Sequence, residues 1–417
     1  MKGKRVKFET ICMIGLGYIG LPTAAVLASR KVKVIGVDIS QNAVDTINRG
    51  EIHIVEPELD ILVRATVNEG YLRATTTPEK ADAFIMAVPT PFKGDDHEPN
   101  LDYIESATRS LAKVLEKGNL VVLESTSPVG ATEKMAAWLA EERPDLSFPQ
   151  DAGEDADIRI AHCPERVLPG HVIRELVEND RVIGGMTPKC TEAATDLYKI
   201  FVKGACIATN ARTAEMAKLT ENASRDVQIA FANELSVLCD KMGIDVWELI
   251  SLANRHPRVN ILQPGCGVGG HCIAVDPWFI VNAYPDDAHI IKTARETNDG
   301  KPLFVISKVK KAIIEIDNPK IACLGLAFKP NIDDLRESPA LEITKMLSDN
   351  TDFKILAVEP NVKTLPKVLE NRKNVKLVSL EEALSEADVV VVLVNHKEFS
   401  AETLGSDVKI LDFVNAI

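Results

Sequence analysis

The sequence lacks three features that would each define a class of protein: a long basic segment, a long apolar segment and paired CxxC cysteines. Its 48 lysines and arginines are outnumbered by 61 aspartates and glutamates, for a formal net charge of −13, so nucleic acid is not an expected partner. The longest apolar stretches, such as residues 389–394, are far too short to cross a bilayer, so no membrane partner is expected. The eight cysteines are scattered, as in proteins that keep their thiols reduced, and residues 1–12 have no apolar signal-peptide core. We therefore expect a cytoplasmic location.

The sequence does contain a repeated alternation of short apolar runs and helical segments. At 417 residues, 46% of them hydrophobic, the chain can bury large cores and should form two or three domains. Residues 10–14 are an apolar run that leads into GLGYIG and then an alanine-rich helical segment, and a second apolar run ends in Asp38. This order predicts NAD binding, with the pyrophosphate at the helix start and the ribose hydroxyls on the aspartate. The predicted contacts are Gly15, Gly17, Tyr18, Ile19, Gly20 and Asp38.

Two further apolar runs end in polar residues. Residues 83–88 stop before Thr90, and residues 120–123 stop at the sequence ESTSPVG. Because ligands of doubly wound sheets bind at the carboxyl ends of strands, Thr90, Ser125 and Thr126 are expected to line the nicotinamide side of the cleft. Ordinary helix capping explains the same residues equally well.

A second copy of the pattern occupies the end of the chain, at residues 320–327, 353–359 and 387–394. Ala327 and Pro330 replace its second and third glycines, so we expect a ligand other than a dinucleotide. The loop that follows, FKPNIDDLRESP, is densely charged, and cations such as Lys329 suit phosphate oxygens. A solvated charged loop is the alternative.

Between the two copies, residues 209–242 contain neither proline nor glycine, and Gly243 stands where a glycine would stop a helix. Such a helix would be roughly 50 Å long, enough to bridge two domains or to form a subunit interface, so at least a dimer is expected. Lys218 and Asn222 would share one of its faces, and Asn233 would need a polar partner.

Residues 265–272, GCGVGGHC, place a thiol in a glycine-dense loop four residues before Asp276. Glycine lets the backbone approach a ligand closely, and a thiol presented there can attack an electrophile. A structural cysteine is the alternative. Zinc could be suggested by Cys266, His271 and Cys272, but adjacent residues seldom share one tetrahedral ion. No metal is predicted.

The ordered segments GLGYIG, STSPVG, CPERVLPG, AEMAKLTEN, FANEL, GCGVGGHCIAVDP and GLAFKPNIDDLRESP resemble those of the nucleotide-sugar 6-dehydrogenases, the family of UDP-glucose dehydrogenase. The resemblance covers nearly the whole chain. It implies an α/β fold with two Rossmann-like doubly wound domains, joined by a helical central domain with a long bridging helix. We expect an NAD-binding domain at residues 1–205, a central dimerisation domain with the cysteine loop at 206–300, and a UDP-sugar-binding domain at 301–417.

The resemblance also implies roles for particular residues. Cys272 would add to a C6 aldehyde and then carry a thioester, so that two NAD accept four electrons. Lys218 and Asn222 would stabilise charge on the C6 oxygen. Asp276 and Thr126 would hold or activate water, with Glu165 as a candidate acid or base. Arg336 would link the last domain to the cofactor. The implied substrate contacts are Glu165, Arg166, Val167, Lys218, Asn222, Arg258, Asn260, Gly265, Gly269 and Lys329, with Arg258 as a candidate contribution from a neighbouring subunit.

Within the family, residues 256–264 together with GGHC most resemble the members that oxidise UDP-N-acetyl-D-mannosamine for surface polysaccharides. UDP-glucose and UDP-N-acetylglucosamine are alternative substrates. A two-electron hydroxyacid dehydrogenase and a non-catalytic NAD-binding regulator are more remote alternatives, because neither needs the thiol together with a second Rossmann-like domain.

The chain departs from the family pattern at two positions. UDP-glucose dehydrogenases have a second glutamate where this chain has Pro169, so Glu165 is expected to act alone. Cys266 replaces a proline of the closer relatives, and its place in the same loop as Cys272 suggests a disulfide between them under oxidative stress.

Overall fold

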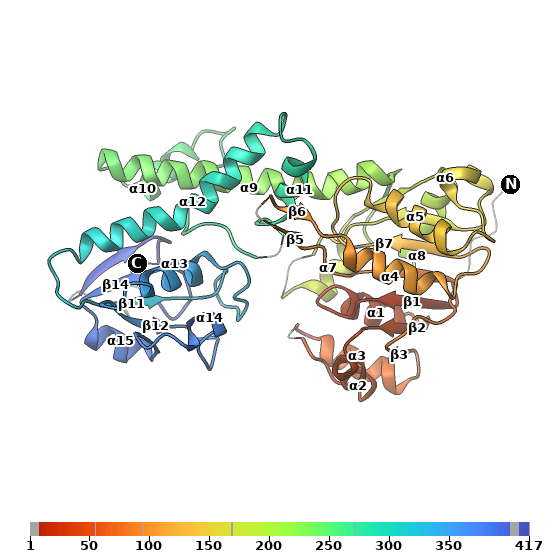
Figure 1. Cartoon of the computed structure of the whole chain (residues 1–417), viewed down its shortest axis with the longest axis horizontal. Coiled ribbons are helices and arrows are strands. Elements are labelled where there is room, and N and C mark those ends of the chain that lie inside the picture. Colours follow the sequence, from red (N-terminus) through yellow and green to blue (C-terminus); the bar gives the residue numbers. More distant parts are fainter. Residues whose placement is uncertain are drawn as a thin grey trace. The chain divides into compact units, whose positions relative to one another are not determined.

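The computed structural model describes residues 8–54, 56–94, 96–167, 170–270, 272–400 and 408–416 (Figure 1). Two compact units divide the chain, Met1–Thr220 and Glu221–Ile417. Pro169 and His271 lie outside the described residues. Within the described ranges, no helix is long and apolar enough to cross a membrane.

An eight-stranded sheet runs through the first unit in the order β10-β9-β8-β7-β4-β1-β2-β3. Neighbouring strands are parallel except β8 and β9, so β9 and β10 extend a six-stranded doubly wound sheet in the opposite direction. The strands are β1 (Thr10–Ile14), β2 (Lys33–Val37), β3 (Leu72–Thr75), β4 (Ala83–Met86), β7 (Leu120–Leu123), β8 (Arg159–His162), β9 (Arg181–Gly185) and β10 (Cys206–Asn210).

Helices pack on both faces of this sheet, which explains why its central strands are continuous apolar runs. Successive residues of β1 point to opposite faces, and Ile11 and Met13 join one apolar cluster while Cys12 and Ile14 join another. The helices are α1 (Gly20–Ser29), α2 (Gln41–Asn48), α3 (Leu59–Asn68), α4 (Asp102–Ala112), α5 (Ala131–Glu142), α6 (Pro149–Ala152), α7 (Val172–Glu178) and α8 (Pro188–Tyr198), with a 3-10 turn η1 (Gly153–Asp155) and a hairpin of β5 (Phe92–Lys93) and β6 (Glu98–Pro99).

Helix α9 (Ala211–Met242) is continuous over 32 residues and spans the division between the units (Figure 1). Gly243 follows it with φ of +68°, the left-handed conformation that ends many helices. The predicted long helix is therefore confirmed, with its first residue two positions later than the predicted range.

The second unit contains a five-stranded parallel sheet in the order β13-β12-β11-β14-β15. Ile321 and Cys323 of β11 join one apolar cluster and Ala322 and Leu324 another, as in the first unit. The strands are β11 (Lys320–Leu324), β12 (Lys354–Val358), β13 (Val375–Leu377), β14 (Val389–Val392) and β15 (Lys409–Asp412), and the helices are α10 (Val246–Ala253), α11 (Asp276–Ala283), α12 (His289–Ala312), α13 (Pro339–Ser348), α14 (Lys367–Glu370) and α15 (Leu380–Glu386).

The predicted fold class, two Rossmann-like sheets with a helical region and a long helix between them in the sequence, is confirmed. The predicted domain limits at residues 205 and 300 stay a prediction, because the compact units divide the chain once, at residue 220.

Candidate active site

The turn between β1 and α1 has the glycine arrangement of a dinucleotide loop. Gly15 has φ of +88°, and a Cβ there would lie 2.4 Å from the carbonyl oxygen of Ala87. A Cβ on Gly20 would lie 1.8 Å from the oxygen of Gly15, so the packing of the protein itself requires both glycines. A Cβ on Gly17 would meet no atom of the described residues within 4 Å. The open side of the loop is therefore at Gly17, where the pyrophosphate of NAD would approach the backbone.

Asp38 follows β2 and holds the same loop. Its Oδ2 accepts a hydrogen bond from the Leu16 N–H at 3.0 Å, and its Oδ1 accepts one from the Ser40 N–H at 2.9 Å. Each carboxylate oxygen can accept more than one hydrogen bond, so the ribose hydroxyls of NAD can be held as well. Tyr18 is exposed and Ile19 half-buried in the turn that enters α1. These residues fit a bound NAD.

The polar residues after β4 and β7 have mixed surroundings. The Ser125 hydroxyl accepts a hydrogen bond from the Val88 N–H at 2.9 Å and donates one to the Met86 carbonyl oxygen at 3.4 Å, so it joins the two strand ends. Thr90 Oγ1 is buried and has no partner within the described residues. Thr126 is half-buried. The structural role is thus evident for Ser125, and the nicotinamide contacts of all three stay predictions.

Glu165 follows β8 and shares an electrostatic environment with Lys218 of α9. Glu165 is 8% exposed, and burial raises the pKa of its carboxyl while the charges of Arg181 and Lys218 act to lower it. Hydrogen bonds from the backbone of Val167 and Arg166 also favour the ionised form. One carboxyl oxygen, Oε1, has no partner within the described residues. Three of the predicted substrate residues, Arg166, Val167 and Lys218, therefore act on a fourth, Glu165, at the end of β8.

Glu215 anchors the start of α9 to the segment that contains Thr126. This buried carboxylate accepts hydrogen bonds from the Gly130 N–H at 2.7 Å, the Thr132 N–H at 2.8 Å and the Thr132 hydroxyl at 2.6 Å. It thereby satisfies N–H groups that the first turn of α5 leaves unpaired. Lys218 lies three residues further along the helix that this anchor fixes, and its charge acts on Glu165.

In the second unit, Cys272 is exposed and lies in the turn before α11, four residues ahead of its first residue Asp276. Its carbonyl oxygen accepts hydrogen bonds from the Asp276 N–H at 2.8 Å and the Val275 N–H at 3.1 Å. Asp276 is 4% exposed, and its Oδ2 accepts a hydrogen bond from Asn222 Nδ2 at 2.5 Å. Asn222 and Asp276 are 54 residues apart in the sequence, and this hydrogen bond brings them together. Cys272 joins them through its backbone hydrogen bond with Asp276.

The glycines before Cys272 pack against the charged loop between β11 and α13. A Cβ on Gly269 would lie 2.5 Å from the Glu337 carbonyl oxygen and 2.7 Å from Cβ of Phe328. A Cβ on Gly270, where φ is +83°, would lie 2.9 Å from the Phe328 ring, and the Gly270 N–H donates to the Arg336 carbonyl oxygen at 3.1 Å. The two loops therefore form one surface, and the glycines are needed for this contact.

The same surface displays the predicted phosphate ligand. Lys329 is exposed on the loop after β11. Arg336 is exposed too, and its Nε donates to both oxygens of Asp334, at 2.8 and 3.0 Å. Lys329 is therefore available to a substrate, whereas Arg336 is held by its neighbour.

Hydrogen bonds with two asparagine side chains hold the loop that contains the other predicted substrate residues. Asn254 Nδ2 donates to the Ile261 carbonyl oxygen at 3.0 Å, and its Oδ1 accepts the Ile261 N–H at 2.7 Å, which closes the exposed loop with Arg258 and Asn260. The Gly265 N–H donates to Oδ1 of Asn233 at 2.9 Å. Asn233 also donates to Asn298 at 2.8 Å, so the expectation that this buried amide needs partners is confirmed.

The two cysteines of the expected disulfide differ in their surroundings, because Cys266 is buried and Cys272 is exposed. Cys266 is 5% exposed and packs in the apolar cluster with Val305 and Val309 of α12. Burial raises the pKa of its thiol to about 12 although the nearby Lys301 acts to lower it. The reduced structure thus holds Cys266 as a buried thiol, and the disulfide with Cys272 under oxidative stress stays a prediction.

Sequence reasoning missed a buried charged cluster at the ends of β7 and β8. Glu124 is 1% exposed and its Oε1 lies 3.9 Å from Nη1 of Arg181, which is also 1% exposed. Burial raises the pKa of Glu124 to about 7, although the Arg181 charge acts to lower it. The available signal was a charged residue directly beside an all-apolar strand, in LVVLE and in RVIGG.

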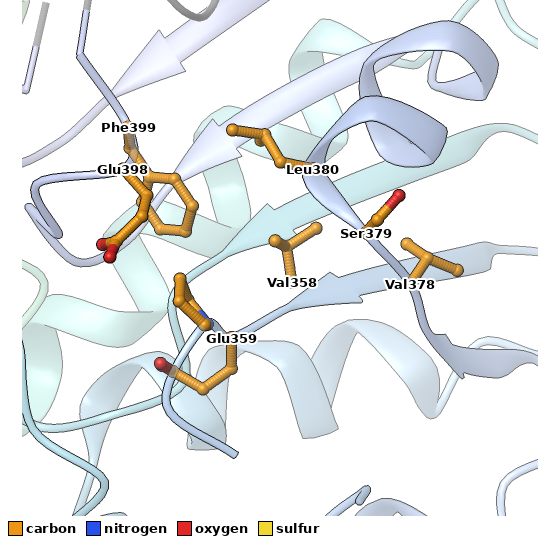
Figure 2. Close-up of a pocket in the computed structure, with 8 residues that line it drawn as sticks. Val358, Glu359, Val378, Ser379, Leu380, Glu398 and Phe399 are labelled. Carbon is orange, nitrogen blue, oxygen red and sulfur yellow. The ribbon is translucent and has the colours of Figure 1, made fainter. Parts of the chain in front are cut away.

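A pocket at the end of β12 contains none of the predicted residues (Figure 2). Its one buried carboxylate, Glu359, occupies the place in the second sheet that Asp38 has in the first. Glu359 accepts N–H groups of Leu326 and Ala327 at 2.8 and 3.0 Å, and it is paired with His396 Nε2 at 3.0 Å. In the second unit a histidine of the chain itself therefore pairs with the carboxylate that corresponds to Asp38, the predicted ribose contact of the first. The lining residues are Val358, Glu359, Pro360, Val378, Ser379, Leu380, Glu398 and Phe399.

No group of three or more His, Cys, Asp or Glu within the described residues could hold a metal ion. The glycine loop with Asp38 fits NAD, and the exposed thiol beside an asparagine–aspartate pair fits covalent chemistry on a carbonyl. Fold and residues together define an NAD-dependent dehydrogenase with two Rossmann-like halves.

Comparison with known proteins specifies that class. Models of the UDP-glucose/GDP-mannose dehydrogenase family match as its NAD binding domain at residues 9–202, central domain at 212–300 and UDP binding domain at 322–417. A UDP-N-acetyl-D-mannosamine dehydrogenase of Campylobacter jejuni is 74% identical over 94% of this chain and 97% of its own length. An NDP-N-acetyl-D-galactosaminuronic acid dehydrogenase of Ralstonia nicotianae is 66% identical over 94% and 92%. The solved UDP-D-ManNAc dehydrogenase of Pyrococcus horikoshii superposes with a TM-score of 0.87 at 39% identity, covering 98% of this chain and 96% of that one.

The chain therefore belongs to the UDP-glucose/GDP-mannose dehydrogenase family. The predicted resemblance, the enzyme class and the cofactor NAD are confirmed. The hydroxyacid dehydrogenase and the non-catalytic regulator are set aside, because all three family domains match in order.

Proposed function

We propose that the protein oxidises the C6 alcohol of UDP-N-acetyl-D-mannosamine to a carboxylate, for the synthesis of surface polysaccharide. Bound NAD supplies the chemistry of hydride acceptance. The alcohol loses a hydride and a proton to give an aldehyde, and the Cys272 thiol adds to it as a thiohemiacetal. Loss of a second hydride and proton gives a thioester. Water adds to the thioester carbon, the C–S bond breaks, and the thiol regains a proton as the acid leaves.

The contact between Asn222 and Asp276 beside Cys272 carries this proposal. The thiol of Cys272 is exposed, which leaves room for a carbonyl carbon. The Asn222 side-chain amide donates a hydrogen bond at 2.5 Å to the carboxylate of Asp276, the first residue of α11. An amide N–H in that place can stabilise the oxygen of a thiohemiacetal, and the carboxylate can orient a water molecule. A structural cysteine would need neither neighbour.

The residues of the first unit supply the remaining proton chemistry in this proposal. Lys218 stabilises the developing oxyanion at C6, Thr126 holds water, and Glu165 accepts a proton from the attacking water. Oε1 of Glu165 has no hydrogen-bond partner among the described residues, which supports its role as an acceptor. Glu165 acts in its ionised form, so its activity is lost as the pH falls through its pKa.

We assign the nucleotide phosphates to Lys329, with Arg258 as a second cation. The exposure of both side chains supports this assignment. Isothermal titration with UDP should show a Kd at least about tenfold weaker for Lys329→Met than for the wild type, the loss of one charged contact. An unchanged Kd would place the phosphates elsewhere.

The choice of sugar rests on the relatives. N-acetylmannosamine is favoured by the mannosamine dehydrogenase at 74% identity, and an N-acetylgalactosamine sugar is a second candidate because its dehydrogenase is 66% identical.

Purified protein should be incubated with NAD and, separately, UDP-N-acetylmannosamine, UDP-N-acetylgalactosamine, UDP-N-acetylglucosamine and UDP-glucose. We expect two NADH per sugar and the highest kcat/KM with the mannosamine substrate. One NADH per sugar together with a stable aldehyde product would contradict the thioester mechanism.

We propose a homodimer formed through the apolar face of α9 and α10, in the cytoplasm. Phe231, Leu238, Met242 and Leu252 are 52%, 42%, 61% and 62% exposed, which is unusual for a free surface.

The predicted role of Arg258 across the interface can be tested by mixing two inactive variants, Cys272→Ser and Arg258→Ala. A mixed dimer would contain one intact site if Arg258 acts on the partner's substrate, so about a quarter of wild-type activity should return. No recovery in dimers shown to exchange subunits would place Arg258 in its own site.

A further inference from the structure

Arg181, the first residue of β9, is a buried cation that the reaction scheme above does not use. Its side chain is 1% exposed, and none of its three side-chain nitrogens has a hydrogen-bond partner within the described residues. The guanidinium carbon lies 5.7 Å from the centre of the Tyr198 ring. Burying an unbalanced charge costs several kcal/mol, so the surroundings of Arg181 must compensate its charge.

Two carboxyls from neighbouring strand ends provide the opposite charge. Nη1 of Arg181 lies 3.9 Å from Oε1 of Glu124, which also accepts a hydrogen bond from the Tyr198 hydroxyl at 3.1 Å. Glu165 lies three residues beyond the end of β8, the strand that pairs with β9, and the charge of Arg181 acts on its buried carboxyl as well. One buried cation is thus shared by two buried carboxyls.

One cation cannot balance two carboxylates, so one of the two acids holds a proton at neutral pH. Glu165 has further support for its charge, because Lys218 and backbone N–H groups also lower its pKa against the effect of burial. Glu124 is buried more completely, and burial raises its pKa to about 7. The other titratable groups around the pair are Cys163 and Tyr198, whose pKa values burial raises, and the less buried Cys206 and Lys218.

We propose that Arg181 is a positioning residue for the reaction: shared between Glu124 and Glu165, it keeps Glu165 ionised and leaves the proton on Glu124. The inference rests on the proposed function of Glu165 as the acceptor of a proton from water. It explains how a single glutamate serves where UDP-glucose dehydrogenases have two. A second buried carboxyl is present here as well, but it is Glu124 at the end of β7, with Arg181 at 3.9 Å.

Infrared difference spectroscopy tests the protonation pattern without any turnover. Wild-type protein near pH 6 should show the C=O band of a protonated carboxyl, and Glu124→Gln should remove it. Arg181→Met should strengthen the band, because Glu165 then gains a proton as well. A wild-type spectrum without a protonated-carboxyl band, or a band that survives Glu124→Gln, would overturn the assignment. This readout stays decisive even if the protein turns over none of the UDP-sugars, an outcome that would count against the proposed function alone.

The pH profile of kcat tests the positioning role. Arg181→Met removes the charge that lowers the pKa of Glu165, so the acidic limb should move upward by on the order of one to three pH units. Arg181→Lys keeps a charge and should keep most of the limb in place. Arg174→Met, at an exposed arginine paired with Glu178, is the matched control and should leave the limb where it is. A folded, NAD-binding Arg181→Met enzyme with an unmoved acidic limb refutes the role. If that variant does not fold, Arg181→Lys and the infrared band of Glu124 decide.

Discussion

The contact of the glycine loop with the loop after β11 leads to a sharp prediction for Gly269→Ala. The new Cβ would lie 2.5 Å from the Glu337 carbonyl oxygen, whereas ordinary contact begins at 3.4 Å, so that backbone must move by about 0.9 Å. A backbone atom cannot rotate away as a side chain can. Overpacking of this kind costs about 1–3 kcal/mol.

The displaced loop carries Lys329, so the variant should lose catalysis as well as stability. A misplacement of about 1 Å can cost on the order of 100-fold in rate, and we expect a loss of that order in kcat/KM for the UDP-sugar. Stability is measured by the thermal unfolding midpoint and activity by NADH formation. NAD binding, which depends on the other glycine loop, should be unchanged.

Gly265→Ala is the matched control in the same loop. A Cβ there meets no atom of the described residues within 4 Å, and its φ is not in the left-handed region, so stability should change by less than about 0.5 kcal/mol. Equal thermal midpoints for the Gly269 and Gly265 variants would refute the packing argument. Such a result would mean that the two loops are further apart in solution than in this structure.

Three other outcomes are expected. Cys272→Ser should lower NADH formation by roughly 10³-fold or more while NAD binding persists, as measured by steady-state kinetics and titration. Asp226→Asn removes the buried carboxylate that pairs with Arg295 at 2.6 Å, leaves that arginine only the half-exposed Asp299 as a partner, and should cost about 3 kcal/mol in chemical denaturation. Burial alone would raise the pKa of Glu359, but hydrogen bonds from His396 and backbone N–H groups lower it to about 2. The folded pKa lies below the unfolded value, so this group stabilises the protein by roughly 3 kcal/mol above about pH 4.3 and loses that contribution towards pH 2.

The last two of these predictions have controls of their own. The Asp240–Lys308 pair is about one-third exposed, so Asp240→Asn should cost less than about 1 kcal/mol, and equal losses for Asp226→Asn would contradict the burial argument. In Glu359→Gln, the free energy of unfolding should fall less between pH 4.3 and 2 than in the wild type. If both proteins lose the same free energy of unfolding over this pH range, the pairing of Glu359 with His396 does not contribute to acid sensitivity.

Much of the fold could be predicted because its signals are local. Apolar runs ended by glycine or polar residues marked β1, β2 and β11, and the absence of proline and glycine marked α9. The addition of β9 antiparallel to β8 was not predicted, because strand direction depends on a chain path that periodicity does not record.

The site divides in the same way. The spacing of Cys272 and Asp276 is local, and family resemblance supplied Asn222, whose contact with Asp276 the structure contains. The burial of Cys266 and the sharing of Arg181 by two acids depend on elements far apart in sequence, so no pattern in a single segment could indicate them. Buried charges are the feature that sequence reasoning finds least well.

The pairing of Glu359 with His396 has a consequence for the protein in a cell. In the first unit the equivalent carboxylate, Asp38, is the predicted ribose contact, and NAD bound there would stabilise that unit by mass action, about 2.7 kcal/mol when free NAD exceeds Kd by 100-fold. In the second unit an imidazole of the chain itself pairs with the carboxylate, so the contribution of Glu359 does not depend on a ligand. When NAD is scarce, the first unit should therefore lose stability, and limited proteolysis without NAD should cut it faster than with saturating NAD.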